Sequence, residues 1–339
     1  MNHARIGTAH LDIDLPLADG ITALYGPAGA GKSALLEAIA GFTSPQRGRI
    51  LIDDAIVFDA ESGVNLPPEK RRCAWVGPRD ALLPHLTIRQ NLLFAAARWA
   101  RLERTKRVAE MLGRFGLADA LEMRPHQLAP SRRLSAEVAR ALIIEPKMLL
   151  VDDRGPDAGE ALLGLVRDAF EGPVLWVAAR LDLCYNSADR LALVDAGRVV
   201  AYGPARDVIE RPESVEAARL TGISNLYPAT VAALDPGRNQ SRLECEDFVL
   251  SGPYLKARFK GDRVWVGIRA EDVRVHAGEL EPDVNFMPVQ LLRVIERPRS
   301  VRLEFAGGIT AEIPREQYSR QKDNKGWQVD FPPAALRVF

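Results

Sequence analysis

The chain has 339 residues, 47% hydrophobic and 27% charged, as is typical of folded globular proteins. Its 45 basic and 45 acidic side chains cancel, so no net charge favours nucleic acid or an anionic membrane as partner. The three cysteines form no Cys-x-x-Cys pair, and neither a leader segment nor a run of apolar residues long enough to span a membrane is evident, which favours a reduced, cytosolic protein. At this length we expect two domains.

The first informative segment is a predicted strand, tight turn and helix around residues 26–33. Residues 6–25 read as strands, and residues 34–40 are good helix formers. The turn fits G-x-x-x-x-G-K-[ST], in which backbone N–H groups and a helix N-terminus face phosphate oxygens. The lysine of this pattern reaches the β- and γ-phosphates, and the hydroxyl binds Mg²⁺. The predicted phosphate-binding residues are Gly26, Pro27, Ala28, Gly29, Ala30, Gly31, Lys32 and Ser33.

A second candidate lies at the end of a predicted buried strand. Residues 86–146 have a helical texture, and residues 147–153 then form an apolar run that ends in two aspartates. In P-loop NTPases an acid at this place completes the Mg²⁺ site, which makes Asp152 the candidate metal ligand. The alternative is a structural role, in which the aspartates form a turn after the strand.

The remainder of the chain changes from α/β texture to short strands. Residues 174–178 predict another buried strand, residues 195–198 a hairpin turn, and residues 205–220 a helical linker. Beyond residue 223 the strands are short and alternating, and residues 301–313 predict a β-hairpin. The predicted domains are therefore residues 1–222 and 223–339.

These motifs resemble the nucleotide-binding subunit of an ABC importer. The phosphate loop, the strand ending in Asp152 and residues 189–199 carry the resemblance. Residues 84–92 are similar to the stretch after the Q-loop of oxyanion importers, and residues 261–273 resemble the C-terminal β-domain of molybdate, sulfate, iron and sugar importers. The layout is closest to the molybdate type, and the resemblance covers nearly the whole chain.

The resemblance implies an α/β P-loop NTPase fold of ABC type, with an inserted helical subdomain at about residues 86–146 and a small all-β, OB-like C-terminal domain. It also implies ATP and Mg²⁺ as ligands, and membrane permease subunits as partners at the inner face of the cell membrane. A second nucleotide-binding subunit would complete a homodimer or a heterodimer. The C-terminal domain could take an oxyanion ligand, and no nucleic acid is expected.

Several positions depart from the family pattern. The glutamine that senses Mg²⁺ is matched by Pro78, and the glutamate that polarises the attacking water by Asp153, which is the candidate catalytic residue. The L-S-G-G-Q signature is replaced by residues 129–133, Ala-Pro-Ser-Arg-Arg, whose arginines would supply charge without the glycine geometry. Ala179 stands where the switch histidine is expected. The family's aspartate-ending motif is replaced by residues 154–158, and Ala9 or His10 occupies the area of the adenine platform.

The departures separate two tasks. Lys32, Ser33 and Asp152, which would hold phosphates and Mg²⁺, are present, whereas the groups that organise the water and close the dimer are replaced. We therefore expect ATP binding with hydrolysis that is weak or dependent on an intact partner. One alternative is a non-hydrolysing regulatory or ligand-sensing protein derived from such a subunit. A weaker one is a P-loop small-molecule kinase.

Overall fold

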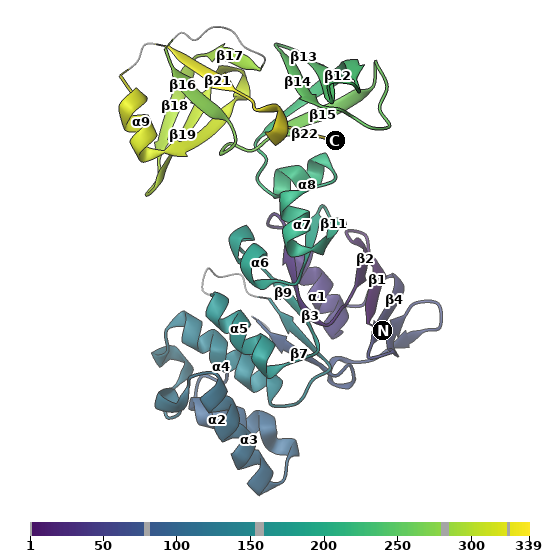
Figure 1. Cartoon of the computed structure of the whole chain (residues 1–339). Helices are drawn as coiled ribbons and strands as arrows, with labels where there is room; N and C mark the ends of the chain where they lie inside the picture. Colours follow the sequence, from purple (N-terminus) through teal and green to yellow (C-terminus); the bar gives the residue numbers. More distant parts are fainter. Residues whose placement is uncertain (1, 78–81, 153–158, 279–284, 324–325) are drawn as a thin grey trace. The chain divides into compact units, whose positions relative to one another are not determined.

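The structure is a computed structural model that describes residues 2–77, 82–152, 159–278, 285–323 and 326–339 (Figure 1). The chain divides into two compact units, the first ending at Arg211 and the second running from Pro212 to Phe339. The sequence placed the boundary between residues 222 and 223, where the strand texture begins. Thr221 nevertheless belongs with the second unit, because its carbonyl accepts a hydrogen bond from Arg269 Nη1 at 2.9 Å.

The first unit is built on one mixed sheet in the order β6-β5-β4-β1-β2-β11-β10-β3-β9-β8-β7. The strands β10, β3, β9, β8 and β7 are parallel to their neighbours in that order. The C-terminal ends of β3, β7, β8 and β9 therefore share one edge of the sheet, where α/β proteins bind ligands. The strand bounds are β1 (His3–Gly7), β2 (Asp12–Pro16), β3 (Gly20–Tyr25), β4 (Arg47–Ile52), β5 (Ala55–Asp59), β6 (Val64–Asn65), β7 (Cys73–Val76), β8 (Met148–Val151), β9 (Pro173–Val177), β10 (Arg190–Asp195) and β11 (Arg198–Pro204).

The helices confirm the predicted helical insertion between β7 and β8. Here α2, α3 and α4 pack against one another. Pro130, inside the predicted helical stretch, occupies the first turn of α4, where the missing N–H of proline costs no hydrogen bond. The helix bounds are α1 (Lys32–Ala40), α2 (Ile88–Ala95), α3 (Arg101–Arg114), α4 (Pro130–Leu142), α5 (Glu160–Ala169), α6 (Leu181–Ser187), α7 (Ala205–Glu210), α8 (Val215–Leu220) and α9 (Arg315–Gln321).

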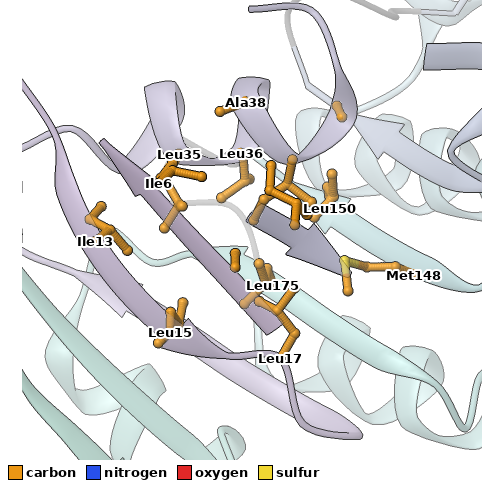
Figure 2. Close-up of a cluster of buried hydrophobic side chains, with 14 of the residues drawn as sticks. Ile6, Ile13, Leu15, Leu17, Leu35, Leu36, Ala38, Met148, Leu150 and Leu175 are labelled. Atoms are coloured by element: carbon orange, nitrogen blue, oxygen red, sulfur yellow. The ribbon is translucent and has the colours of Figure 1, made fainter. Parts of the chain in front are cut away.

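The apolar face of α1 packs on the sheet and fixes the helix that follows residues 26–33. Leu35 and Leu36 are fully buried, and each such leucine contributes roughly 1.5–3 kcal/mol to folding. The strand β8 is buried along its whole length, as the sequence predicted. Figure 2 shows the side chains of this core, which come mainly from α1 and from the sheet. The labelled residues are Ile6, Ile13, Leu15, Leu17, Leu35, Leu36, Ala38, Met148, Leu150 and Leu175.

A buried arginine holds the far end of α1. Arg71 is 1% exposed, and its Nη1 donates to the carbonyls of Ala38 at 2.7 Å and Ile39 at 3.0 Å. Its Nε also donates to Leu66 O, and its Nη2 to Asn65 Oδ1, both at 2.7 Å. Since the last carbonyls of a helix carry partial negative charge, this guanidinium stabilises the C-terminus of α1.

The second unit consists mainly of antiparallel strands. Among the described residues they form three sheets, in the orders β14-β13-β12-β15-β22, β16-β21-β17 and β18-β19-β20. The predicted hairpin is confirmed by β19 and β20, where Val301 pairs with Ile313. The strand bounds are β12 (Asn225–Asp235), β13 (Gln240–Cys245), β14 (Val249–Pro253), β15 (Arg263–Ile268), β16 (Arg274–Ala277), β17 (Phe286–Val289), β18 (Leu291–Glu296), β19 (Ser300–Phe305), β20 (Thr310–Pro314), β21 (Trp327–Asp330) and β22 (Arg337–Val338).

A buried asparagine connects two of these sheets. Asn225 donates from Nδ2 to Ile268 O at 3.2 Å and to Thr310 O at 2.8 Å. Its Oδ1 accepts from the Thr310 N–H at 2.7 Å. The satisfied amide fixes β12 against β20. Throughout the described residues, no helix is both long and apolar enough to cross a bilayer.

Candidate nucleotide-binding site

Residues 26–33 form the predicted turn between β3 and α1. Gly29 and Gly31 adopt φ values of 80° and 103°, a region that favours glycine. Lys32 opens α1, and its Nζ donates to Gly26 O and Pro27 O, both at 2.7 Å. The loop thus combines the N-terminal end of a helix with an ammonium group at its rim, which is an arrangement suited to phosphate oxygens.

The two predicted Mg²⁺ ligands meet beside this loop. Ser33 Oγ donates to Asp152 Oδ1 at 3.0 Å, although the residues are 119 positions apart. Asp152 follows β8 and is 3% exposed, and its N–H donates to Val76 O at 2.8 Å. A carboxylate and a hydroxyl are hard oxygen ligands, and Mg²⁺ is bound by one or two carboxylates together with substrate phosphates and water. The residues present therefore fit a Mg²⁺ ion that accompanies a phosphate chain.

A pocket of about 590 Å³ lies over the loop, within the usual range for small-molecule sites. Ala179 lines it together with the end of β9, so the position aligned with the switch histidine does lie in this pocket, where its methyl group offers no hydrogen bond. Tyr25, which sequence reasoning missed, also lines the pocket. Burial raises the pKa of this phenol, so it keeps its proton at neutral pH. The full lining is Tyr25, Gly26, Ala28, Gly29, Ala30, Gly31, Lys32, Ser33, Ala34, Val177, Ala178 and Ala179.

A second pocket of about 550 Å³ adjoins the loop at Gly29. The sequence indicated Ala9 or His10 in the area of the adenine platform, and both residues line this pocket. The His10 imidazole is the aromatic ring of the lining, which also holds Arg198 and an ion pair between Arg47 Nη2 and Asp12 Oδ1 at 3.4 Å. The turn at residues 195–198, which the sequence identified as a hairpin within a segment of family resemblance, thus lies beside the phosphate loop.

The signature segment, residues 129–133, lies at the start of α4. Its Arg132 is engaged within the helical subdomain, because Nη1 donates to Asp119 Oδ2 and Nη2 to Gly116 O, both at 3.0 Å. The hydrogen bond with Asp119 raises the pKa of Arg132 and lowers that of the aspartate. Arg133 Nε lies 3.8 Å from Glu137 Oε1. No residue of the segment lines the phosphate-loop pocket within the described part of the chain.

Pro78, Asp153 and residues 154–158 lie outside the described residues. The structure therefore brings together residues 26–33, Asp152 and Ala179, with Ala9 and His10 next to them. No motif identified Tyr25, and the hairpin and family resemblance predicted at residues 195–198 did not indicate that this turn lies beside the phosphate loop. The available signal was the position of both at the ends of strands that finish at the same edge.

Comparisons with known proteins agree with this arrangement. The ABC transporter family model matches residues 11–154. A molybdenum import ATP-binding protein of Rhodospirillum rubrum is 33% identical over 68% of this chain and 64% of its own length, so that match spans just under two thirds of the relative. The corresponding protein of Brucella melitensis biotype 1 is 32% identical over 98% of this chain and 93% of its own length.

Solved structures show the same fold. An ATP-binding subunit of an ABC transporter superposes with a TM-score of 0.52 at 25% identity, covering 62% of this chain and 91% of that one. A dimeric bacterial ABC transporter cassette superposes with a TM-score of 0.51 at 21% identity, covering 60% of this chain and 98% of that one. With the phosphate loop, the Ser33–Asp152 pair and a near full-length relative in agreement, the chain belongs to the ABC importer ATP-binding subunits, in the branch of the molybdenum import ATP-binding proteins.

Proposed function

We propose that this ATP-binding subunit holds Mg·ATP through residues 26–33 and Asp152, and that its own hydrolysis of ATP is impaired. The observation that carries the binding half is the meeting of Ser33 Oγ and Asp152 Oδ1 at 3.0 Å beside the Lys32 ammonium. Lys32 would neutralise the β- and γ-phosphates. Ser33 and Asp152 would supply protein oxygens to Mg²⁺, which when bound stabilises charge on the phosphate chain.

Impaired hydrolysis is supported by what lines the pocket. Phosphoryl transfer depends on positioned groups that stabilise charge, and losing one such donor costs about 10²–10³ in rate. Ala179 places a methyl group in the pocket at the switch position. Asp153, at the catalytic position, is one methylene shorter than glutamate, and a displacement of about 1 Å can cost about 10²-fold. The engagement of Arg132 with Asp119 leaves it facing its own subdomain.

The transport role extends this proposal. The relatives named as molybdenum import proteins support a molybdate-like oxyanion as cargo, and the dimeric cassette supports a second nucleotide-binding subunit, in a homodimer or a heterodimer. Membrane permease subunits would then hold the chain at the cytoplasmic face of the membrane. An oxyanion ligand in the second unit would regulate import.

The decisive experiment measures binding and turnover on the same preparation. Titration calorimetry with Mg·ATP should give saturable uptake by the parent chain and a loss of roughly 10- to 100-fold in affinity for Lys32→Ala, since hydrogen bonds to charged groups are worth about 1.5–3 kcal/mol. Lys70→Ala, an exposed lysine remote from the pocket lining, is the matched control. Phosphate release should be slow in the parent. If the parent chain takes up no nucleotide, the proposal that it binds Mg·ATP is wrong. If it releases phosphate rapidly and in a Lys32-dependent manner, the proposal of impaired hydrolysis is wrong.

A second function follows from the same pocket. If binding occurs without any Lys32-dependent turnover, even with permease subunits and a partner cassette present, the chain is a nucleotide-occupancy switch and not a motor. Ala179 in the pocket lining favours this alternative. Transfer of the phosphate to an acceptor other than water would instead indicate a kinase. Reconstitution with the permease tests the cargo, because molybdate should stimulate turnover or uptake more strongly than sulfate.

A further inference from the structure

Resting on the proposed ATP site, we infer that the turn between β10 and β11 (residues 195–198, the Gly197 turn) orients the phosphate loop, with Gly197 as a positioning residue. The observation is a backbone hydrogen bond from the Gly197 N–H to Ala30 O at 3.0 Å. Ala30 lies inside the phosphate loop, whereas Gly197 is far along the chain in a hairpin that carries no nucleotide motif.

Peptide geometry explains how this hydrogen bond acts on the site. The carbonyl of Ala30 and the N–H of Gly31 belong to one planar trans peptide unit, so they point in opposite directions. Because the carbonyl is held on the side of the hairpin, the Gly31 N–H is directed away from it. Gly31 lines the phosphate-loop pocket, and its N–H donates to no backbone acceptor among the described residues. The Gly197 turn thereby aims a donor at the place of the phosphates.

The turn is itself held from the other side. The carbonyl of Gly197 accepts from the Asp12 N–H at 2.8 Å, which ties the turn to the N-terminal hairpin. Leu11 of that hairpin packs under the loop, since a Cβ on Gly31 would lie 2.4 Å from Leu11 Cδ2. The strand before the turn is equally close, because a Cβ on Gly26 would lie 1.9 Å from Val194 O. The loop therefore rests on the Leu11 side chain at its Gly31 end and on the Val194 carbonyl at its Gly26 end.

Glycine is required at the turn for two separate reasons. Ala196 and Gly197 have φ values of 45° and 78°, as in the type I′ turn of a two-residue hairpin. In addition, a Cβ on Gly197 would lie 1.9 Å from His10 O, so any side chain forces the turn away from its neighbours. That displacement would lengthen or break the hydrogen bond to Ala30.

The chain offers a matched control for this steric effect. Gly63, in the turn between β5 and β6, has a φ of 72°, but a Cβ added there meets nothing within 4 Å. Gly63→Ala and Gly197→Ala thus share the cost of placing alanine at positive φ. Only Gly197→Ala adds a steric clash, between the new Cβ and His10 O. Because asparagine tolerates this φ better, Gly197→Asn with Gly63→Asn separates the two effects if Gly197→Ala folds poorly.

The experiment compares Mg·ATP affinity by calorimetry with amide exchange of residues 26–33 in the nucleotide-free chain. We expect both Gly197 variants to bind Mg·ATP roughly tenfold or more weakly than their Gly63 counterparts, the scale produced by a small misplacement of binding groups. Exchange across the loop should quicken in the Gly197 variants only. Equal affinities and equal exchange in the two series overturn the inference. If the parent chain binds no nucleotide, the proposed function fails, while the exchange comparison still decides the role of Gly197.

Discussion

Two helix N-termini of the first unit invite comparison, because the predicted phosphate loop precedes one and the segment that replaces the family signature lies at the start of the other. The helix α1 opens with glycine, lysine and serine, and its first turn faces a pocket. The helix α4 opens after Ala129 with Pro130, which lacks an N–H, and Arg132 turns back to Asp119. A helix N-terminus attracts anions through its free N–H groups and its dipole, and α4 offers one N–H fewer than α1 because it begins with proline.

Under the proposed function, holding a phosphate chain and completing its reaction would use different parts of the structure. Holding would depend on residues 26–33 and Asp152, which the sheet brings to the same edge. Hydrolysis requires hydrogen-bond donors placed around the γ-phosphate. Ala179, which lines the pocket, has a methyl side chain and supplies none. The predictions below test the two halves separately.

The largest effect is expected from Asp152→Asn, which keeps the shape of the side chain and removes its charge. Mg²⁺ should strengthen ATP binding by the parent chain, and the variant should lose roughly tenfold or more of that gain, since interactions with charged groups are the stronger ones. Calorimetry with and without Mg²⁺ measures the difference. Asp168→Asn, an exposed aspartate on α5, serves as the control. An unchanged Mg²⁺ dependence would remove Asp152 from the metal site.

An intermediate effect, on the rate of phosphate release, is expected when a hydrogen-bond donor is placed in the pocket at position 179. Ala179→His, alone and combined with Asp153→Glu, should raise steady-state phosphate release by roughly tenfold, because a single placed donor can account for 10²–10³ in rate. Ala179→Leu adds bulk without a donor and should give no rise. If neither histidine variant is faster than the parent, the signature segment limits turnover.

The smallest effect is expected from Arg132→Ala. The guanidinium contacts Asp119 and Gly116 O within the helical subdomain, so its removal should leave Mg·ATP affinity of the isolated chain essentially unchanged. The unfolding midpoint should also change little, because exposed ion pairs contribute weakly to stability. Calorimetry and thermal denaturation of the variant provide the measurements. A marked loss of affinity would assign Arg132 to the nucleotide and weaken the contrast between α1 and α4.

The sequence by itself determined the local elements of this protein. The turn at residues 26–33, the strand before Asp152 and the hairpin at residues 301–313 follow from spacing and composition, because glycine, β-branched and apolar residues act on their immediate neighbours. The domain boundary was harder to place, since it depends on which unit the short helix α8 packs with.

Tertiary structure alone decided which of these elements meet. The contact of Ser33 with Asp152 depends on the order of β3, β9 and β8 in the sheet, and that of Gly197 with Ala30 on the pairing of β10 with β3. Strand order is set by burial of the whole apolar surface, to which residues across the chain contribute at once. No short segment carries that information, and for this reason the sequence predicted both the phosphate loop and the hairpin turn at residues 195–198 but not the contact between them.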